Sequence, residues 1–283
     1  MSDTIDAVVD AVASTAPDVR EGLVGRRGYE SGENPSGERQ LAADVYADGL
    51  LEERLLAIDA VGGYASEELD SVVRDDGGNY HVAADPLDGS SNLRSNNTMG
   101  TLFAVYDEPL PASGRDIVAS GFVLYGPITT MVVARDGTVT ESVIDDGDRR
   151  VVETGVTLPE EPTVYGFGGR RPQWREPFAA YASDVAAELK LRYGGAMIGD
   201  VNQVLTYGGI FGYPGLRDRP EGKLRLCFEG HPIAHIVETA GGASSNGSGS
   251  LLGSTPDRLH ERTPLFVGND EYIARLEAAL DSN

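Results

Sequence analysis

Residues 85–92 read Asp-Pro-Leu-Asp-Gly-Ser-Ser-Asn and directly follow the strand-like stretch NYHVAA. The carboxylates of Asp85 and Asp88 lie three residues apart at the end of this strand, so both can face one point. Hard cations such as Mg²⁺ take carboxylate and phosphate oxygens as ligands. The amides and hydroxyls of the following Gly-Ser-Ser can bind an anion. The stretch therefore predicts a cation beside a phosphate group, although an ordinary turn with a capping serine fits the spacing equally well.

The sequence around this stretch alternates between helical and strand-like patterns. Apolar residues at helical spacing predict helices over 3–19, 38–60, 175–190 and a segment opened by Pro232. Strand-like runs lie near 79–84, 101–107, 117–125, 129–135, 138–144 and 223–229. Gly-rich stretches without periodicity predict loops at 21–37 and 241–250. This alternation predicts a layered α/β fold. We expect a boundary between two halves in the stretch 145–162, which contains Asp-Gly-Asp and proline residues.

Composition narrows the class of protein. The 283 residues include 45 acidic and 23 basic ones, for a formal net charge of −22. A field this negative repels phosphate backbones, which argues against nucleic acid as a partner. No run approaches 18 apolar residues and the N-terminus is acidic, so neither a membrane span nor a signal peptide is expected. The single cysteine, Cys227, leaves no intramolecular disulfide, and a cytoplasmic protein is predicted.

The shortage of lysine adds a second inference from charge. Lys190 and Lys223 are the only lysines, and the remaining basic residues are arginines. An acidic surface poor in lysine is expected of a protein from a very salty cytoplasm, where dissolved ions screen the repulsion between like charges. We expect the midpoint of unfolding to rise steeply with added salt up to molar levels. A flat response would contradict this inference and favour the alternative, an ordinary acidic protein.

Several segments of the sequence together match one known family. They are DPLDGSSN with TMGTLFAVYD after it, and GERQLAADVYADGLL, YASEEL, LRYGGAMIGDVNQVLTYGGIFGYP, GKLRLCFEGHPIAHIVETAGG and HERTPLFVGN. These segments resemble class I fructose-1,6-bisphosphatases and the related sedoheptulose-1,7-bisphosphatases, which belong to the lithium-sensitive, magnesium-dependent sugar and inositol phosphatases. The resemblance covers residues 37–280 in order. It implies a layered α-β-α-β-α fold with two mixed sheets. The metal-site half, with helices and a mostly antiparallel sheet, would be 1–155, and the α/β half that binds sugar phosphate would be 156–283.

The resemblance also assigns a metal site. It implies that Mg²⁺, two or more ions per subunit with Mn²⁺ as a substitute, is held by Glu67, Asp85, the Leu87 carbonyl, Asp88 and Glu229. With Glu68 beside these ligands, five carboxylates converge, and they would repel one another strongly without a cation. Glu68 would help to activate the attacking water, together with an acid on the preceding helix. The spacing leaves open whether that acid is Asp48 or Asp44. Composition alone also allows Glu67 and Glu68 to be a solvated acidic pair.

The substrate residues follow from the same resemblance. The scissile phosphate would bind at Gly89, Ser90 and Ser91, and the remote phosphate at Arg192, Tyr193, Tyr213 and Lys223. In the family this arginine comes from the neighbouring subunit, which implies a homodimer or homotetramer. The implied reaction is hydrolysis of fructose 1,6-bisphosphate to fructose 6-phosphate in gluconeogenesis. The family's asparagine and tyrosine for phosphate are missing near 165–171, where Arg170 and Arg171 are candidate replacements.

Regulation and alternative functions complete the predictions. Relatives from animals and bacteria respond to AMP at an N-terminal site that this chain starts too late to supply in full. Asn79 and Asp107 stand where that site has basic residues, so AMP insensitivity is expected. Three alternatives remain open at this point: a sedoheptulose bisphosphatase, a broad phosphatase of the inositol-1-phosphatase type, and an acidic metal-binding scaffold without activity.

Overall fold

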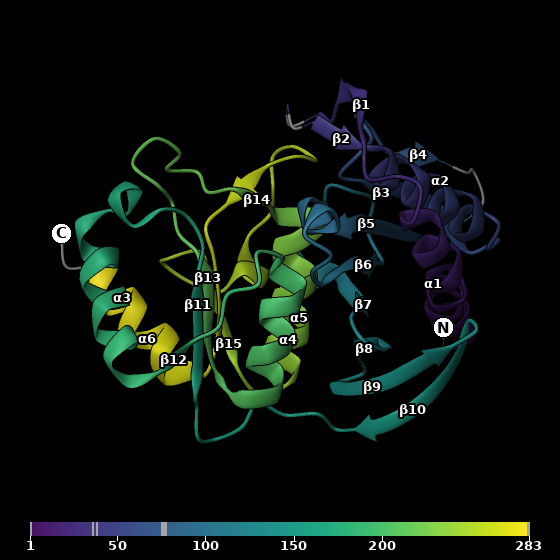
Figure 1. The fold of residues 1–283 in the computed structure, drawn as a ribbon. Coiled ribbons are helices and arrows are strands. Elements are labelled where there is room, and N and C mark those ends of the chain that lie inside the picture. The colour runs from purple at the N-terminus through teal and green to yellow at the C-terminus, as the bar shows by residue number, and fades with distance from the viewer. Residues whose placement is uncertain (1, 36, 38, 75–77, 282–283) are drawn as a thin grey trace.

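The computed structural model describes residues 2–35, 37, 39–74 and 78–281, and it has five layers. Two helices cover the outer face of a large sheet, two further helices lie between this sheet and a smaller one, and a third pair covers the far side of the smaller sheet (Figure 1). The helices are α1 (Ser2–Leu23), α2 (Ala42–Leu56), α3 (Glu176–Glu188), α4 (Met197–Tyr207), α5 (His231–Thr239) and α6 (Asp270–Asp281). The predicted α-β-α-β-α architecture with two mixed sheets is confirmed.

The large sheet has the order β10-β9-β8-β7-β6-β5-β3-β4. Its strands are β3 (Val61–Ser66), β4 (Val73–Arg74), β5 (Tyr80–Asp88), β6 (Met99–Tyr106), β7 (Ile117–Tyr125), β8 (Thr129–Arg135), β9 (Thr138–Asp145) and β10 (Asp148–Thr154). Only β3 and β5 run parallel to each other, and the other neighbours are antiparallel. Strand β6 is buried along its whole length because helices pack against both faces of the sheet, which explains why its sequence is apolar apart from Thr101.

The smaller sheet has the order β12-β11-β13-β17-β15. Its strands are β11 (Val164–Phe167), β12 (Lys190–Leu191), β13 (Gly209–Tyr213), β15 (Ala243–Ser245) and β17 (Leu265–Gly268). Two short antiparallel pairs lie outside both sheets: β1 (Tyr29–Glu33) with β2 (Arg39–Leu41), and β14 (Leu224–Arg225) with β16 (Arg262–Thr263). The side chains between the two sheets form one apolar core around α4 and α5, which fixes the two halves against each other.

The helical pattern at the N-terminus was predicted correctly, since Ile5, Val8, Val9 and Val12 are all buried against the large sheet and α2. The predicted loop 21–37 is wrong in part, because it holds the last turn of α1 and strand β1. The predicted loop 241–250 contains β15, where Ser245 is buried and donates a hydrogen bond to Glu277. The soft stretch 145–162 contains β10, a mostly exposed edge strand whose sequence lacks an apolar face.

The largest correction concerns residues 223–229, which were predicted to form one strand. Only β14 is extended, and Leu226–Gly230 form a π-helical turn that continues directly into α5. The backbone amide of Arg225 donates a hydrogen bond of 2.6 Å to the carboxylate of Glu229, which closes this turn. Cys227 is buried in the core, as expected, although it lies on the turn rather than on a strand. Within the part of the chain that the structure describes, no helix combines the length and the apolar character that spanning a membrane requires.

Candidate active site

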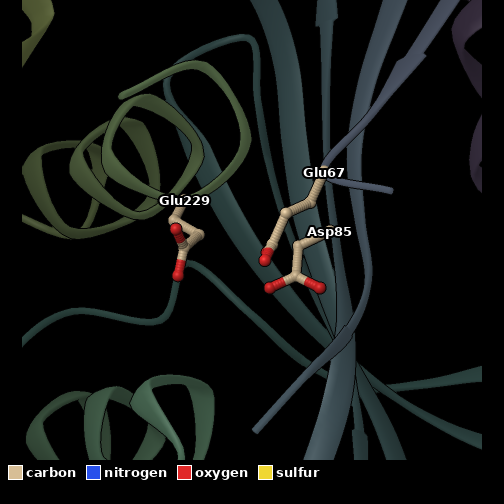
Figure 2. Close-up of side chains that lie close together, drawn as sticks. All are labelled: Glu67, Asp85 and Glu229. Atoms are coloured by element: carbon tan, nitrogen blue, oxygen red, sulfur yellow. The ribbon is translucent and has the colours of Figure 1, made fainter. Parts of the chain in front are cut away.

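Three buried carboxylates converge where the two halves meet. Glu67 follows the end of β3, Asp85 lies on β5, and Glu229 lies on the π-helical turn. One oxygen of each lies within 4.8 Å of the others (Figure 2). We call these three residues the carboxylate cage. Because β3 and β5 are parallel neighbours, they bring Glu67 and Asp85 to the same edge of the sheet, and the turn before α5 brings Glu229 from across the interface.

The cage opens into a cavity of about 470 Å³. The lining combines acidic groups, the Gly-Ser-Ser segment and basic groups from both halves: Leu41, Asp44, Glu67, Glu68, Asp85, Leu87, Asp88, Gly89, Ser90, Ser91, Arg94, Gly195, Met197, Tyr213, Lys223, Leu224, Arg225 and Glu229. The structure therefore brings together all the residues predicted to hold metal and all those predicted to hold the scissile phosphate. Three other predicted site residues, Asp48, Arg192 and Tyr193, do not line this cavity.

The electrostatics of the cage favour a bound cation. Burial, followed by the charges of Glu67, Asp88 and Glu229, raises the pKa of Asp85 well above its ordinary value. Burial and Glu67 likewise raise the pKa of Glu229 to about 8. Like charges this close cannot all ionise without a compensating positive charge. The oxygen-only donor set fits a hard divalent cation such as Mg²⁺.

Arg225 supplies part of that compensation from inside the protein. Its side chain is 2% exposed, and its Nη2 lies 2.8 Å from Oε1 of Glu67. Its Nη1 lies 3.7 Å from Oε2 of Glu229. One guanidinium balances one of the three carboxylates, so the cage retains an excess of negative charge. The sequence analysis missed Arg225. The available signal was a charged residue inside an otherwise apolar run, four positions before Glu229.

Asp88 and the Gly-Ser-Ser segment border the cage on the side of α4. Burial raises the pKa of Asp88 to about 6, although a hydrogen bond from the Ile198 amide and the charge of Lys223 oppose this shift. That hydrogen bond, 2.7 Å long, joins Asp88 to the first turn of α4. Gly89 has φ = 74° and its added Cβ would lie 2.2 Å from Cβ of Ala196, so only glycine fits there. Ser90 and Ser91 then begin a short 3₁₀ helix beside the cavity.

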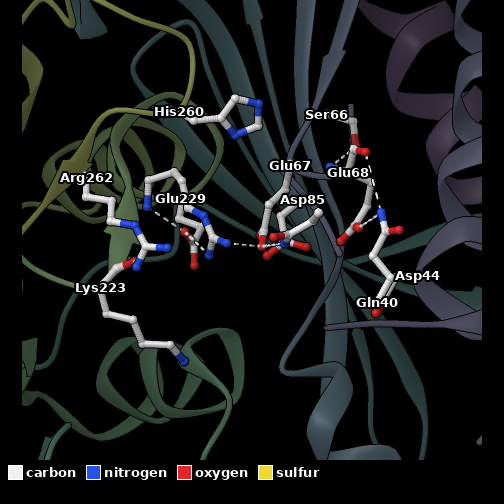
Figure 3. Close-up of polar contacts among 12 residues, drawn as sticks. Gln40, Asp44, Ser66, Glu67, Glu68, Asp85, Lys223, Glu229, His260 and Arg262 are labelled. Carbon is white, nitrogen blue, oxygen red and sulfur yellow. Dashed lines mark hydrogen bonds and ion pairs between the residues drawn. The ribbon is translucent and has the colours of Figure 1, made fainter. Parts of the chain in front are cut away.

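In Figure 3 the side chain of Glu68 lies beside Asp85, with its carboxylate next to Gln40. Nε2 of Gln40 donates a hydrogen bond of 2.5 Å to its carboxylate. Burial and the charges of Glu67 and Asp44 raise the pKa of Glu68 to about 8. Asp44 also lines the cavity and accepts a hydrogen bond from the Leu41 amide at 2.7 Å. Burial raises the pKa of Asp44 to about 7, despite hydrogen bonds from Leu41 and Ser90.

Asp48 lies one turn further along α2 and has a different environment. It accepts a hydrogen bond of 2.8 Å from the buried hydroxyl of Tyr64 and does not line the cavity. Burial raises its pKa, while hydrogen bonds from Ser66 and Tyr64 lower it. Because successive turns of a helix that lies across a sheet differ in their distance from the strand ends, the two aspartates contact different neighbours. Asp44 is thus the aspartate of α2 that borders Glu68 and the cavity.

The residues predicted to bind the remote phosphate are partly assembled. Tyr213 and Lys223 line the cavity, and Nζ of Lys223 lies 5.5 Å from the centre of the Tyr213 ring. The hydroxyl of Tyr193 lies 2.7 Å from that of Tyr213, so Tyr193 contacts this group from outside the cavity. Arg192 is exposed beyond the edge strand β12. Arg94, which the sequence analysis did not single out, is a further basic residue of the lining.

Comparisons with known proteins agree with this geometry. A family model described as the N-terminal domain of fructose-1-6-bisphosphatase matches residues 3–150, and one described as the C-terminal domain matches residues 158–281. The chain is 76% identical to the class 1 fructose-1,6-bisphosphatase of Natronomonas pharaonis over 282 residues, covering 99% of this chain and 100% of that protein. It is 60% identical to the corresponding protein of Halobacterium salinarum, covering 99% of this chain and 98% of that one. Both relatives come from halophilic archaea.

Solved structures agree with the sequence relatives. The holo form of Leishmania major fructose-1,6-bisphosphatase superimposes with a TM-score of 0.93 at 29% identity, covering 98% of this chain and 94% of that one. The predicted resemblance is therefore confirmed, as is the prediction of a phosphatase. On the strength of both family matches and these relatives, the chain belongs to the class 1 fructose-1,6-bisphosphatase family.

Proposed function

We propose that the protein hydrolyses the 1-phosphate of fructose 1,6-bisphosphate, giving fructose 6-phosphate and phosphate, and that it does so with Mg²⁺. The observation that carries this proposal is the shared cavity. The carboxylate cage, the Gly-Ser-Ser segment, Lys223 and Tyr213 all line it. A cavity built in this way offers one subsite for a phosphate beside a cation and a second, basic subsite for another phosphate.

In this proposal Glu67, Asp85, Asp88, Glu229 and the Leu87 carbonyl hold the cation. Bound divalent cations supply positive charge to the phosphoryl oxygens and the leaving alkoxide, which lowers the barrier to displacement. The amides of Gly89, Ser90 and Ser91 orient the phosphoryl group. Glu68, oriented by Gln40, accepts the proton of the attacking water, with Asp44 beside it.

The test is phosphate release from a panel of substrates with and without Mg²⁺. We expect fructose 1,6-bisphosphate to be the preferred substrate and chelation to stop the reaction. A preference for sedoheptulose 1,7-bisphosphate would change the assigned substrate but not the type of reaction. Equal rates with inositol 1-phosphate would contradict a site built for two phosphates, and the lack of any release would favour the scaffold alternative.

Replacing Lys223 by alanine should impair bisphosphate substrates selectively. A charge-assisted contact contributes about 1.5–3 kcal/mol, so KM for fructose 1,6-bisphosphate should rise about 10- to 100-fold. Hydrolysis of a monophosphate should change little because it does not reach this subsite. Lys190→Ala is the matched control, since the only other lysine is exposed on β12, and it should leave both activities intact. Equal losses on monophosphates and bisphosphates after Lys223→Ala would contradict the assignment.

The two aspartates of α2 should differ in their effect on turnover. We expect Asp44→Asn to lower kcat about 10²- to 10⁴-fold, the range that general acid–base groups supply. Asparagine can still accept the hydrogen bond from Leu41, so the fold should survive. Asp48→Asn should mainly affect stability because Asp48 contacts Tyr64 rather than the cavity. Steady-state rates at saturating Mg²⁺ decide between them, and a larger loss from Asp48→Asn would reverse the assignment.

Four further proposals concern regulation, assembly, cellular role and the division into domains. AMP insensitivity is proposed because Asp107 is acidic where a nucleotide phosphate needs a basic partner, and inhibition at micromolar AMP would refute it. A homodimer or homotetramer is proposed in which Arg192 of a neighbouring subunit completes the remote phosphate site. Size measurement by light scattering tests this assembly.

A cytoplasmic, gluconeogenic role and the division into 1–155 and 156–283 are also proposed. The division is supported by the matched ranges 3–150 and 158–281.

A further inference from the structure

His260 links the two segments that carry the carboxylate cage. Its Nε2 lies 2.8 Å from the carbonyl oxygen of Leu69, a residue 191 positions away in the chain. Leu69 closes the turn after β3, because its amide donates to the carbonyl of Ser66 at 3.2 Å. Glu67 and Glu68 are the two residues inside that turn. The hydrogen bond from His260 therefore holds the end of the turn that presents both glutamates.

The same side chain is fixed to the segment that carries Glu229. The His260 ring packs against the ring of Phe228, with centres 5.1 Å apart. The backbone beside His260 is also fixed to this segment. The Leu226 amide donates a hydrogen bond of 2.8 Å to the Glu261 carbonyl, and Arg262 of β16 lies opposite Arg225 of β14 in an antiparallel strand pair. Figure 3 shows His260 close to Glu67 and Glu229, on one side of the carboxylate groups. The imidazole thus joins the β3 turn to the π-helical turn.

The hydrogen-bonding state of the ring follows from its partners. A carbonyl oxygen only accepts, so Nε2 carries the proton and donates. Nδ1 is buried and has no hydrogen-bond partner among the described residues. Burial, and to a smaller extent the charge of Arg225, lowers the pKa of His260. The neutral ring therefore donates one hydrogen bond, to the Leu69 carbonyl. This arrangement suits a residue that positions the backbone rather than one that transfers protons.

We propose that His260 is a positioning residue that holds Glu67 and Glu229 at the separation a divalent cation requires. The proposal rests on the proposed function, because it takes the cage to be the cation site. Buried carboxylates on separate segments repel one another. Contacts between those segments must therefore keep the carboxylates close enough to share a cation. A residue outside the ligand set that fixes ligand positions commonly changes cation affinity 10- to 100-fold when it is removed.

A pair of variants of equal length separates the hydrogen bond from the packing. His260→Gln places an amide donor near the position of Nε2, whereas His260→Met has a similar length and no donor. We expect the dissociation constant for Mn²⁺, measured by calorimetry without substrate, to rise about 10-fold or more in His260→Met and to stay near the wild-type value in His260→Gln. At saturating cation, KM for the sugar bisphosphate should be unchanged in both variants.

His235→Phe serves as the control for a purely structural loss. His235 makes a hydrogen bond of 2.8 Å with Ser120, away from the cage, so its replacement should lower the melting temperature without changing Mn²⁺ binding. The proposal fails if His260→Met binds Mn²⁺ like the wild type, or if Gln and Met weaken binding equally. A wild-type protein that binds no Mn²⁺, or whose binding survives Asp85→Asn, would instead overturn the proposed function of the cage. If His260→Met does not fold, His260→Phe, which keeps an aromatic ring against Phe228, replaces it in the same comparison.

Discussion

Asp85→Asn should abolish turnover and, at the same time, raise the melting temperature of the cation-free protein. Asp85 is buried, and the surrounding carboxylates raise its pKa well above the ordinary value. Removing its charge relieves repulsion inside the cage, while removing a cation ligand deprives the phosphoryl group of its compensating charge. We expect kcat to fall at least about 10³-fold, equivalent to roughly 4 kcal/mol of transition-state stabilisation.

Turnover should fall while the melting temperature rises, so the expected result differs from that of a general loss of structure. Asparagine retains an oxygen that can accept the Leu87 amide, which donates to Asp85 at 3.0 Å, so the local turn should persist. Circular dichroism and calorimetry with a chelator present measure the fold and its stability, and phosphate release with Mg²⁺ measures turnover. A variant that keeps near-normal rates would end the assignment of Asp85. A variant that loses both activity and stability would show that Asp85 supports the fold instead.

The cation-free protein should lose stability as pH rises from about 5 to about 8, and Mg²⁺ should remove most of this loss. Folding raises the pKa of Asp88 to about 6, of Asp44 to about 7, and of Glu68 and Glu229 to about 8, mainly through burial. The folded state therefore binds more protons than the unfolded state in this window, so the free energy of unfolding falls as pH rises. One pKa unit corresponds to about 1.4 kcal/mol, and the shifts together predict a loss of several kcal/mol.

A divalent cation competes with the protons on its ligands Asp85, Asp88 and Glu229 for the same oxygens, and its charge lowers the pKa of the neighbouring Glu68 and Asp44. Binding at pH 6.5 should release about one to three protons, because ligands must be deprotonated to coordinate. Melting temperatures across the pH range, with chelator or with Mg²⁺ at constant salt, give the stability difference. Binding heats in two buffers of different ionisation enthalpy give the proton count. Asp85→Asn serves as the control, since it should shrink the effect of Mg²⁺. Parallel melting curves with and without Mg²⁺ would contradict the prediction.

Much of the site could be predicted because its residues lie next to recognisable local patterns. The strand at 79–84, the carboxylates Asp85 and Asp88, and the Gly-Ser-Ser segment form one continuous stretch, so their proximity required no knowledge of the tertiary fold. The matched segments elsewhere in the chain added Glu67 and Glu229 through resemblance rather than through spacing. The structure places both beside Asp85.

Other features could not be predicted because long-range contacts decide them. An apolar run at 223–229 is typical of a strand, yet it turns because the Glu229 carboxylate accepts the Arg225 amide and the chain must enter α5. Asp44 and Asp48 have similar local sequence contexts, and their different surroundings are set by tertiary contacts such as the hydroxyl of Tyr64, which donates a hydrogen bond to Asp48. Arg225 and His260 gain their significance from partners far away in the sequence, Glu67 and Leu69.

The sequence by itself therefore determined the layered α/β class through periodicity and the acidic, phosphate-binding stretch through contiguous residues, and its motifs indicated the family and the five-layer fold through resemblance. Only the tertiary structure decided which aspartate of α2 borders the cavity, and that Arg225 and His260 contact the segments that carry the cage. The physical reason is that electrostatic and hydrogen-bonding partners are set by distance in space, and the segments carrying Glu67 and Glu229 meet only after both sheets and the helices between them have packed.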